Sequence, residues 1–134
     1  MNSFLRVVAL SIVAALSGSM VAAQDFAKDK GFAAFQVGDN ATALKEWRSL
    51  AEQGDSKAQI NLGILYAEGK GVPQDPTTAH MWYSIGSANA GNEMASSVAP
   101  RYRANIERIM TPQQIASATK RANVCMASNY QDCD

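Results

Sequence analysis

The side chains that could carry out catalysis are few and scattered along the chain. The single histidine, His80, lies in "TTAHMWY", residues 77–83, beside no serine or cysteine motif. A catalytic histidine needs a nucleophile to activate and a carboxylate to orient it, so we interpret His80 as a polar group at a helix edge. The carboxylates form no pair of the kind that glycosidases use; they are Glu46, Glu52, Glu68 and Glu93. The sequence therefore predicts no catalytic residues and a protein that is not an enzyme.

The stretch "YAEGKGVPQDP", residues 66–76, raises the possibility of phosphate binding. Its glycines could present backbone N–H groups to a phosphate. A P-loop, however, requires GxxxxGK followed by Ser or Thr, whereas here Val72 and Pro73 follow the GKG core. We interpret the stretch as a joint in which Gly69 ends one helix and an aspartate caps the next. No cofactor is expected, and Lys70 and Gln74 are expected to be exposed and available to a partner.

The two cysteines, Cys125 and Cys133, lie close together near the C-terminus. A zinc site would lack ligands because no further cysteine or histidine lies nearby, so no metal is expected. The CxxC spacing of redox motifs is absent, although a reactive thiol pair remains the alternative. In an oxidising compartment the two cysteines would pair, and we predict a disulfide.

The N-terminal segment has the layout of a signal peptide. Met1 to Arg6 carries one positive charge, and the apolar run at residues 7–21 is interrupted by serines and a glycine. That run is too short and too polar for a stable span of ~20 residues, and the small side chains before residue 24 suit a signal peptidase. We predict a signal peptide at residues 1–23, a periplasmic or secreted chain, and no membrane insertion after cleavage.

The charges balance overall but cluster locally. The chain has 12 basic and 12 acidic residues, which gives no global case for nucleic-acid binding. Residues 100–121 are nevertheless rich in basic side chains, among them Arg101, Arg103 and Arg108. A solvated face is the ordinary interpretation of such a cluster. The alternatives are that this basic face contacts an anionic polymer or substrate, or that it is itself the partner site.

The sequence predicts helices separated by capping residues, and it lacks the alternation of apolar and polar residues that is typical of strands. "TPQQ", residues 111–114, is a capping box that predicts a helix over residues 112–127. The helix after Asp55 carries apolar residues on two faces, so we expect neighbours on both sides. Pro100 disfavours helical geometry at Ala99, and we expect a kink or a break there.

Segments of the chain are similar to each other, with a repeat period of roughly 30 to 40 residues. "AEQGDSKA", residues 51–58, matches "SANAGNEMA", residues 87–95. Such a period, built from helix pairs, indicates a solenoid of stacked hairpins. We predict one domain, residues 24–134, made of the segments 26–54 (first repeat), 55–91 (second repeat), 92–128 (divergent third segment and cap) and 129–134 (short tail).

The second repeat resembles a known family. "AQINLGILYAEGKGVPQDPTTAHMWY", residues 58–83, is similar to the Sel-like repeats, a branch of the tetratricopeptide-like helical repeats. The resemblance implies an all-α superhelix of stacked hairpins with a C-terminal capping helix. It also implies that the chain works as a protein–protein interaction module or adaptor, without catalysis of its own. The alternative is an envelope enzyme, or an accessory subunit of one, that contacts an anionic polymer through the basic face.

The inner helices of such solenoids line a concave face that binds a partner. Helical phase opposite the core stripe places seven residues on this face: Phe26, Asp29, Gln36, Lys57, Ile60, Ile64 and Glu68. With barely two hairpins and a cap, the face is short. We therefore expect the partner to be a peptide segment or one helix of another protein, and the sequence leaves the oligomeric state open.

Overall fold

The computed structural model describes residues 30–89 and 91–134, so the predicted signal peptide, residues 1–23, lies outside the described part of the chain. Residues 30–36 are helical. The helices that follow are α2 (Asn40–Glu52), α3 (Ser56–Glu68), α4 (Pro76–Ala88), the π-helical turn η1 (Met94–Val98), α5 (Ala99–Glu107) and α6 (Pro112–Ala127). The described residues contain no strand, and the prediction of an all-α helical-repeat solenoid is confirmed.

Short polar side chains start the helices, as the sequence predicts. Asp39, Asp55 and Asp75 each accept a hydrogen bond from the backbone N–H three residues later, at 3.1, 2.9 and 3.1 Å. Thr111 and Gln114 form the reciprocal capping box at the start of α6. These bonds satisfy backbone donors that a helix leaves without partners in its first turn.

The turn between α3 and α4 is the "GKG" stretch, and backbone geometry explains its glycines. Gly69 ends α3 in the left-handed conformation (φ 66°), and its N–H donates to the carbonyl of Leu65. Gly71 also has a positive φ, 73°, and a Cβ there would lie 2.9 Å from the carbonyl oxygen of Asn40. The loop therefore crosses the start of α2 closely enough that only glycine fits.

Lys70 and Gln74, the loop residues expected to be available to a partner, form contacts within the chain. Lys70 forms an ion pair with Glu68 at 2.7 Å, and its ammonium group lies 4.8 Å from the ring centroid of Phe35. Gln74 donates to the carbonyl of Ala67 at 2.9 Å, which satisfies an acceptor at the end of α3. Both side chains thus help to close the hairpin.

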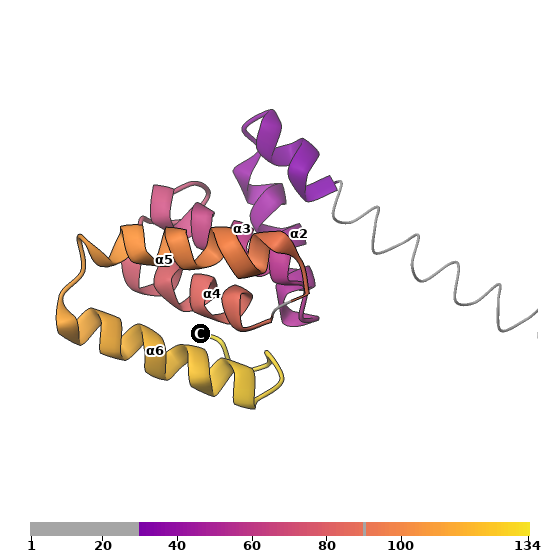
Figure 1. Cartoon of the computed structure of the whole chain (residues 1–134). Coiled ribbons are helices and arrows are strands. Elements are labelled where there is room, and N and C mark those ends of the chain that lie inside the picture. Colours follow the sequence, from indigo (N-terminus) through magenta and orange to yellow (C-terminus); the bar gives the residue numbers. More distant parts are fainter. Residues whose placement is uncertain (1–29, 90) are drawn as a thin grey trace, which may run out of the picture.

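The helices stack so that α3 and α4 form the centre of the described structure. α3 packs between α2 and α4, and α4 in turn packs against α5 and α6. Figure 1 shows α5 and α6 on opposite sides of α4. One surface depression lies between α3, α4 and α5, and a second lies between α4, α5 and α6.

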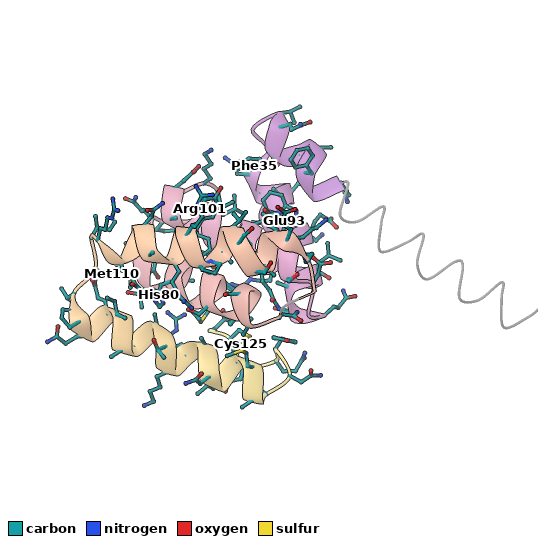
Figure 2. The ribbon with its side chains drawn as sticks, viewed as in Figure 1. Phe35, His80, Glu93, Arg101, Met110 and Cys125 are labelled. Carbon is teal, nitrogen blue, oxygen red and sulfur yellow. A yellow bond between two sulfur atoms is a disulfide. The ribbon has the colours of Figure 1, made fainter. Side chains whose placement is uncertain are left out.

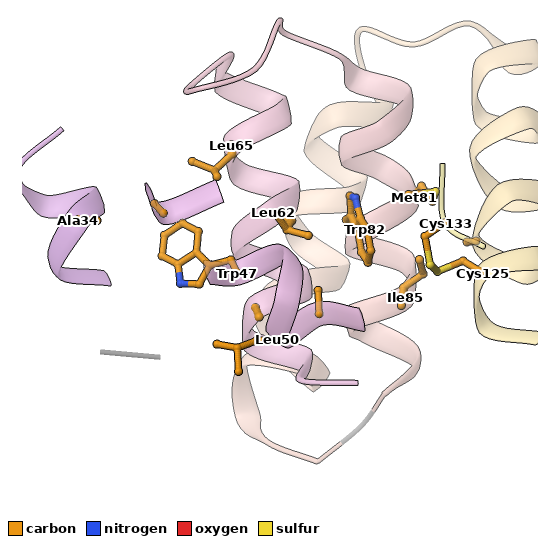
Figure 3. Packing of buried hydrophobic residues seen from close by; sticks show 14 residues of the cluster. Ala34, Trp47, Leu50, Leu62, Leu65, Met81, Trp82, Ile85, Cys125 and Cys133 are labelled. Carbon is orange, nitrogen blue, oxygen red and sulfur yellow. A yellow bond between two sulfur atoms is a disulfide. The ribbon is translucent and has the colours of Figure 1, made fainter. Parts of the chain in front are cut away.

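Two buried clusters hold this stack together, and α3 contributes to both. Leu62 and Leu65 join Trp47 of α2 and Trp82 of α4 in the first cluster, and Figure 3 shows Trp82 between α3 and the side where α6 lies. Ile60, on another face of α3, joins the second cluster, which is built with α4, η1 and α5. The prediction of neighbours on both sides of this helix is confirmed.

The expected break at Pro100 takes a different form. Ala99 is helical (φ −60°, ψ −43°), so the expectation that Pro100 disfavours helical geometry there is wrong. The N–H of Ala99 donates to the carbonyl of Met94, five residues back, and α5 begins directly after this π-helical turn. The missing N–H of Pro100 thus falls at the junction where the hydrogen bonds change from the π-helical spacing of η1 to the α-helical spacing of α5.

A disulfide joins Cys125 to Cys133, as predicted. It brings the chain after α6 back against the first cluster, to which both cysteines belong. The last residue, Asp134, forms an ion pair with Arg48 of α2 at 2.9 Å. Residues 129–134 therefore connect the end of α6 to α2.

Candidate protein-binding site

An open groove lies between α3, α4 and α5, with a volume of about 320 Å³. It is called here the α3–α5 groove. Its lining combines apolar and aromatic side chains with two polar ones: Ile64, Ala67, Glu68, Tyr83, Tyr102, Asn105, Ile106 and Ile109. Pockets that bind ligands are mostly apolar with a few polar groups that fix orientation. The α3–α5 groove has this composition.

The apolar lining of the groove has a buried floor and an exposed edge. Tyr83 of α4 is buried, and its ring lies 5.6 Å from that of Tyr102 of α5, measured between centroids. Burial, together with nearby Tyr102 and Glu68, raises the pKa of the Tyr83 hydroxyl, which stays neutral at physiological pH. Ile109 and Tyr102 are 66% and 38% exposed. Exposed aromatic and aliphatic side chains around a packed floor are typical of protein-binding hot spots.

The predicted concave residues do not all reach this groove. Ile64 and Glu68 line it. Lys57 is exposed and lies seven residues before Ile64, which places it on the same face of α3 about two turns earlier. Gln36 is exposed in the helical segment 30–36. Phe26 and Asp29 lie outside the described residues.

The placement of Ile60 on an exposed concave face is wrong. Its side chain is fully buried in the second cluster, where it faces α4. A Cβ at Gly86 of α4 would lie 2.7 Å from Ile60 Cγ1, so the two helices meet closely at this point. The sequence pattern already placed Ile60 and Ile64 on one side of the helix; only the depth at which α4 packs distinguishes the buried residue from the groove residue.

The predicted basic face divides between two sides of α5. Arg101 and Arg108 are exposed, and Figure 2 shows Arg101 on the ribbon of α5. Arg103 is half-buried and lines a second depression, between α4, α5 and α6, with a volume of about 340 Å³. The three arginines therefore do not form one continuous surface.

His80 lies at the bottom of this second depression (Figure 2). Its side chain is buried, and Nε2 lies 2.7 Å from Glu107 Oε1 of α5. Ser84 Oγ lies 3.4 Å from the other ring nitrogen, Nδ1. The interpretation of His80 as an edge group without a carboxylate partner is wrong, because α5 folds back onto α4 and brings Glu107 to it. The sequence signal is weak, since 27 residues separate the two side chains.

Metal and membrane sites are not found in the described part of the chain. Residues 30–89 and 91–134 hold no group of three or more histidine, cysteine, aspartate or glutamate side chains placed to bind a metal ion. Within the same residues, no helix has the length and apolar character needed to span a bilayer.

Comparison with known proteins identifies the central hairpin. Residues 56–90, which contain α3 and α4, match the Sel1 repeat. The chain is 30% identical over 119 residues to protein sel-1 homolog 2 of Homo sapiens, a match that covers 88% of this chain and 17% of the relative. It is 34% identical over 90 residues to the proteins of the same name in Mus musculus and Rattus norvegicus, covering 67% of this chain and 13% of each relative. No solved structure matches the chain.

The chain thus spans about one sixth of the length of the human relative and less of the rodent ones. The activities and partners of those larger proteins are not transferred to it by these matches. The stretch at residues 58–83, which resembles the Sel-like repeats in sequence, lies within the matched segment. The α3–α4 hairpin, which forms two walls of the α3–α5 groove, therefore matches the Sel1 repeat, a repeat that generally mediates protein–protein interaction and is generally non-catalytic.

Proposed function

We propose that the chain is an exported adaptor that binds a segment of another protein in the α3–α5 groove and has no catalytic activity of its own. The observation that carries this proposal is the groove itself, an apolar surface depression of which half the lining residues belong to the hairpin that matches the Sel1 repeat. Two residues assigned to the binding face from sequence, Ile64 and Glu68, line it.

The size of the groove favours a peptide over a large folded surface. Ligand pockets typically have volumes of about 300–1,000 Å³, and the α3–α5 groove, at about 320 Å³, lies at the lower end of that range. Such a volume accepts one or two large apolar side chains. The partner segment therefore inserts an apolar anchor between Tyr102 on α5, Ile109 in the turn after α5, and Ile64 on α3, while its backbone runs along the rim.

The envelope location is part of the proposal. The apolar run at residues 7–21 supports export, and the Cys125–Cys133 disulfide is typical of an oxidising compartment. Mass spectrometry of the protein purified from a bacterial periplasmic fraction tests it. A chain that begins at Gln24 and carries no alkylatable thiol is the expected result. An intact N-terminus, or two free thiols, would contradict the export proposal without affecting the groove.

Selection of phage-displayed random peptides on the chain, followed by anisotropy titration of a selected fluorescent peptide, tests the groove. Tyr102→Ala and Ile109→Asp remove exposed apolar surface from the lining. Removal of a hot-spot side chain costs at least about 2 kcal/mol, so each variant is expected to weaken binding about 30-fold. Val124→Asp is the matched control, because Val124 is also an exposed apolar residue but lies on α6 outside the lining. Equal losses in the control, or no loss in the groove variants, would refute the site.

One observation favours the second candidate, an envelope enzyme or its accessory subunit. In space, His80 lies between Ser84 and Glu107, as the imidazole of serine hydrolases lies between a hydroxyl and a carboxylate, but the ring nitrogens are exchanged: Nδ1 faces the hydroxyl and Nε2 the carboxylate. The 3.4 Å between Ser84 Oγ and His80 Nδ1 exceeds the usual reach of about 2.6–3.2 Å between nucleophile and base, and the ring is 2% exposed. Incubation with a fluorophosphonate, followed by mass spectrometry, tests whether Ser84 is an activated nucleophile. A phosphonylated Ser84 would favour a serine hydrolase, and an unmodified Ser84 would exclude one at this site.

A further inference from the structure

The two exposed arginines of α5 border the α3–α5 groove. Arg101 lies in α5 and Arg108 is its C-cap residue; they are seven residues apart and the cap backbone is still helical, so they lie on nearly the same side of the helix. Asn105 follows Arg101 by four positions, which makes the two residues neighbours on the helix surface, and Asn105 lines the groove. The arginines therefore stand directly outside the α5 wall, within reach of a partner that rests in the groove.

These arginines carry positive charge that nothing in the described residues neutralises. Neither side chain makes an ion pair or a hydrogen bond there. Glu107, the acidic residue at the end of the same helix, faces the other depression and contacts His80. The basic rim of the groove is thus open to a charged group from outside the described chain.

The opposite wall of the groove carries an acidic residue that is already paired. Glu68 of α3 lies 2.7 Å from the ammonium group of Lys70. Tyr83, in the floor, is a neutral phenol at physiological pH, and burial raises its pKa further. The charge that a partner meets is therefore positive along the α5 rim and close to zero along the α3 rim.

We propose that the partner segment is an acidic peptide whose apolar anchor fills the α3–α5 groove while its carboxylates contact Arg101 and Arg108. This inference rests on the proposed function, because it names the chemistry of the partner for the same groove. The guanidinium fork matches a carboxylate bidentately. The apolar anchor supplies most of the affinity, and the exposed charge pairs supply selection and association rate.

The test uses a peptide from the selection described above and compares charge reversal with removal of apolar surface. Acidic residues are expected to be enriched next to the anchor in the selected peptides. The double variant Arg101→Glu/Arg108→Glu is expected to slow association about tenfold or more at low ionic strength, because electrostatic steering typically contributes 10–1,000-fold. Lys120→Glu is the matched control, since Lys120 is a basic exposed residue on α6 away from the groove.

A charge swap makes the test decisive. A peptide whose acidic residues are replaced by lysine is expected to bind the double variant better than the native chain. If the double variant binds the original peptide as the native chain does, while Tyr102→Ala weakens binding, the acidic-partner inference is overturned and the proposed function stands. If neither change affects binding, both are wrong. Arginine-dependent binding of heparin or of phosphatidylglycerol vesicles, without enrichment of acidic peptides, would also overturn the inference and point to an anionic polymer or a lipid surface.

Discussion

The close approach of α3 and α4 at Gly63 can be tested by adding one methyl group. An ideal Cβ at Gly63 would lie 2.5 Å from Cδ1 of Tyr83 and 3.1 Å from its Cζ. Both helices are central to the stack, and the Tyr83 ring is buried between them. The substitution Gly63→Ala therefore forces either the ring or the helices to move.

Two effects of opposite sign determine how much Gly63→Ala changes the free energy of unfolding. Alanine is favoured over glycine in a helix interior by about 1 kcal/mol. Insertion of a methyl group into a well-packed core costs about 1–3 kcal/mol, and the upper value applies because the neighbours are rigid ring carbons. We expect Gly63→Ala to lower the free energy of unfolding by a net ~2 kcal/mol. A domain of this size has a total of about 5–15 kcal/mol, so the variant stays folded.

Urea denaturation followed by far-UV circular dichroism measures this loss. Gly91→Ala is the control, since a Cβ at Gly91 would meet no atom within 4 Å. This control is expected to be neutral or to stabilise by up to about 1 kcal/mol. In a Tyr83→Leu background, which removes the ring, Gly63→Ala should cost clearly less than in the native chain. A Gly63→Ala variant as stable as the native chain would refute the close packing of α3 on α4.

Three further predictions follow from the caps, the disulfide and the second cluster. Burial by itself would raise the pKa of Asp75, but two hydrogen bonds from Thr78, with the charge of Arg121 and a hydrogen bond from Thr77, lower it below its usual value. This carboxylate therefore stabilises the fold above about pH 4 and loses that contribution as the pH falls further. The difference in stability between the native chain and Asp75→Asn should shrink from pH 6 to pH 3 in urea denaturation. Replacing both cysteines of the Cys125–Cys133 disulfide by serine should lower the free energy of unfolding by about 2–3 kcal/mol, and an unchanged urea midpoint would contradict its role. Ile60→Val should cost about 0.5–1.5 kcal/mol and leave peptide binding unchanged, whereas Ile64→Val should cost less and weaken binding; equal effects would contradict the assignment of these residues to core and groove.

Local chemistry made much of the fold predictable from sequence. Asp39, Asp55 and Asp75 cap helices because a short side-chain acceptor satisfies a nearby donor, and this needs only three residues of context. The Thr111–Gln114 capping box and the Cys125–Cys133 pair are equally local. The repeat pattern of residues 58–83 also predicts how the hairpin closes. Gly69 and Gly71 adopt the positive φ that the turn requires, and Asp75 caps α4.

Long-range packing accounts for what the sequence did not reveal. Ile60 and Ile64 look alike in the helical pattern, and only the position of α4 buries one and leaves the other in the groove. Glu107 reaches His80 because the π-helical turn before Pro100 carries the chain into α5 without a break. Tyr102, Asn105 and Ile109 line the groove from the segment that the sequence predicts to be a divergent third segment and cap. Their signal, an exposed apolar stripe beside the arginines, becomes meaningful once α5 is placed on α4.

Hydrogen–deuterium exchange of the chain with and without a selected peptide tests most directly whether the α3–α5 groove is the binding site. Binding is expected to slow exchange at the backbone amides of residues 64–68 and 102–109, which form the two walls. The exposed apolar residues elsewhere, Phe32, Val37 and Val124, are expected to lie in segments with unchanged exchange. Protection confined to the segments around those three residues, with none along the groove, would contradict the proposed function.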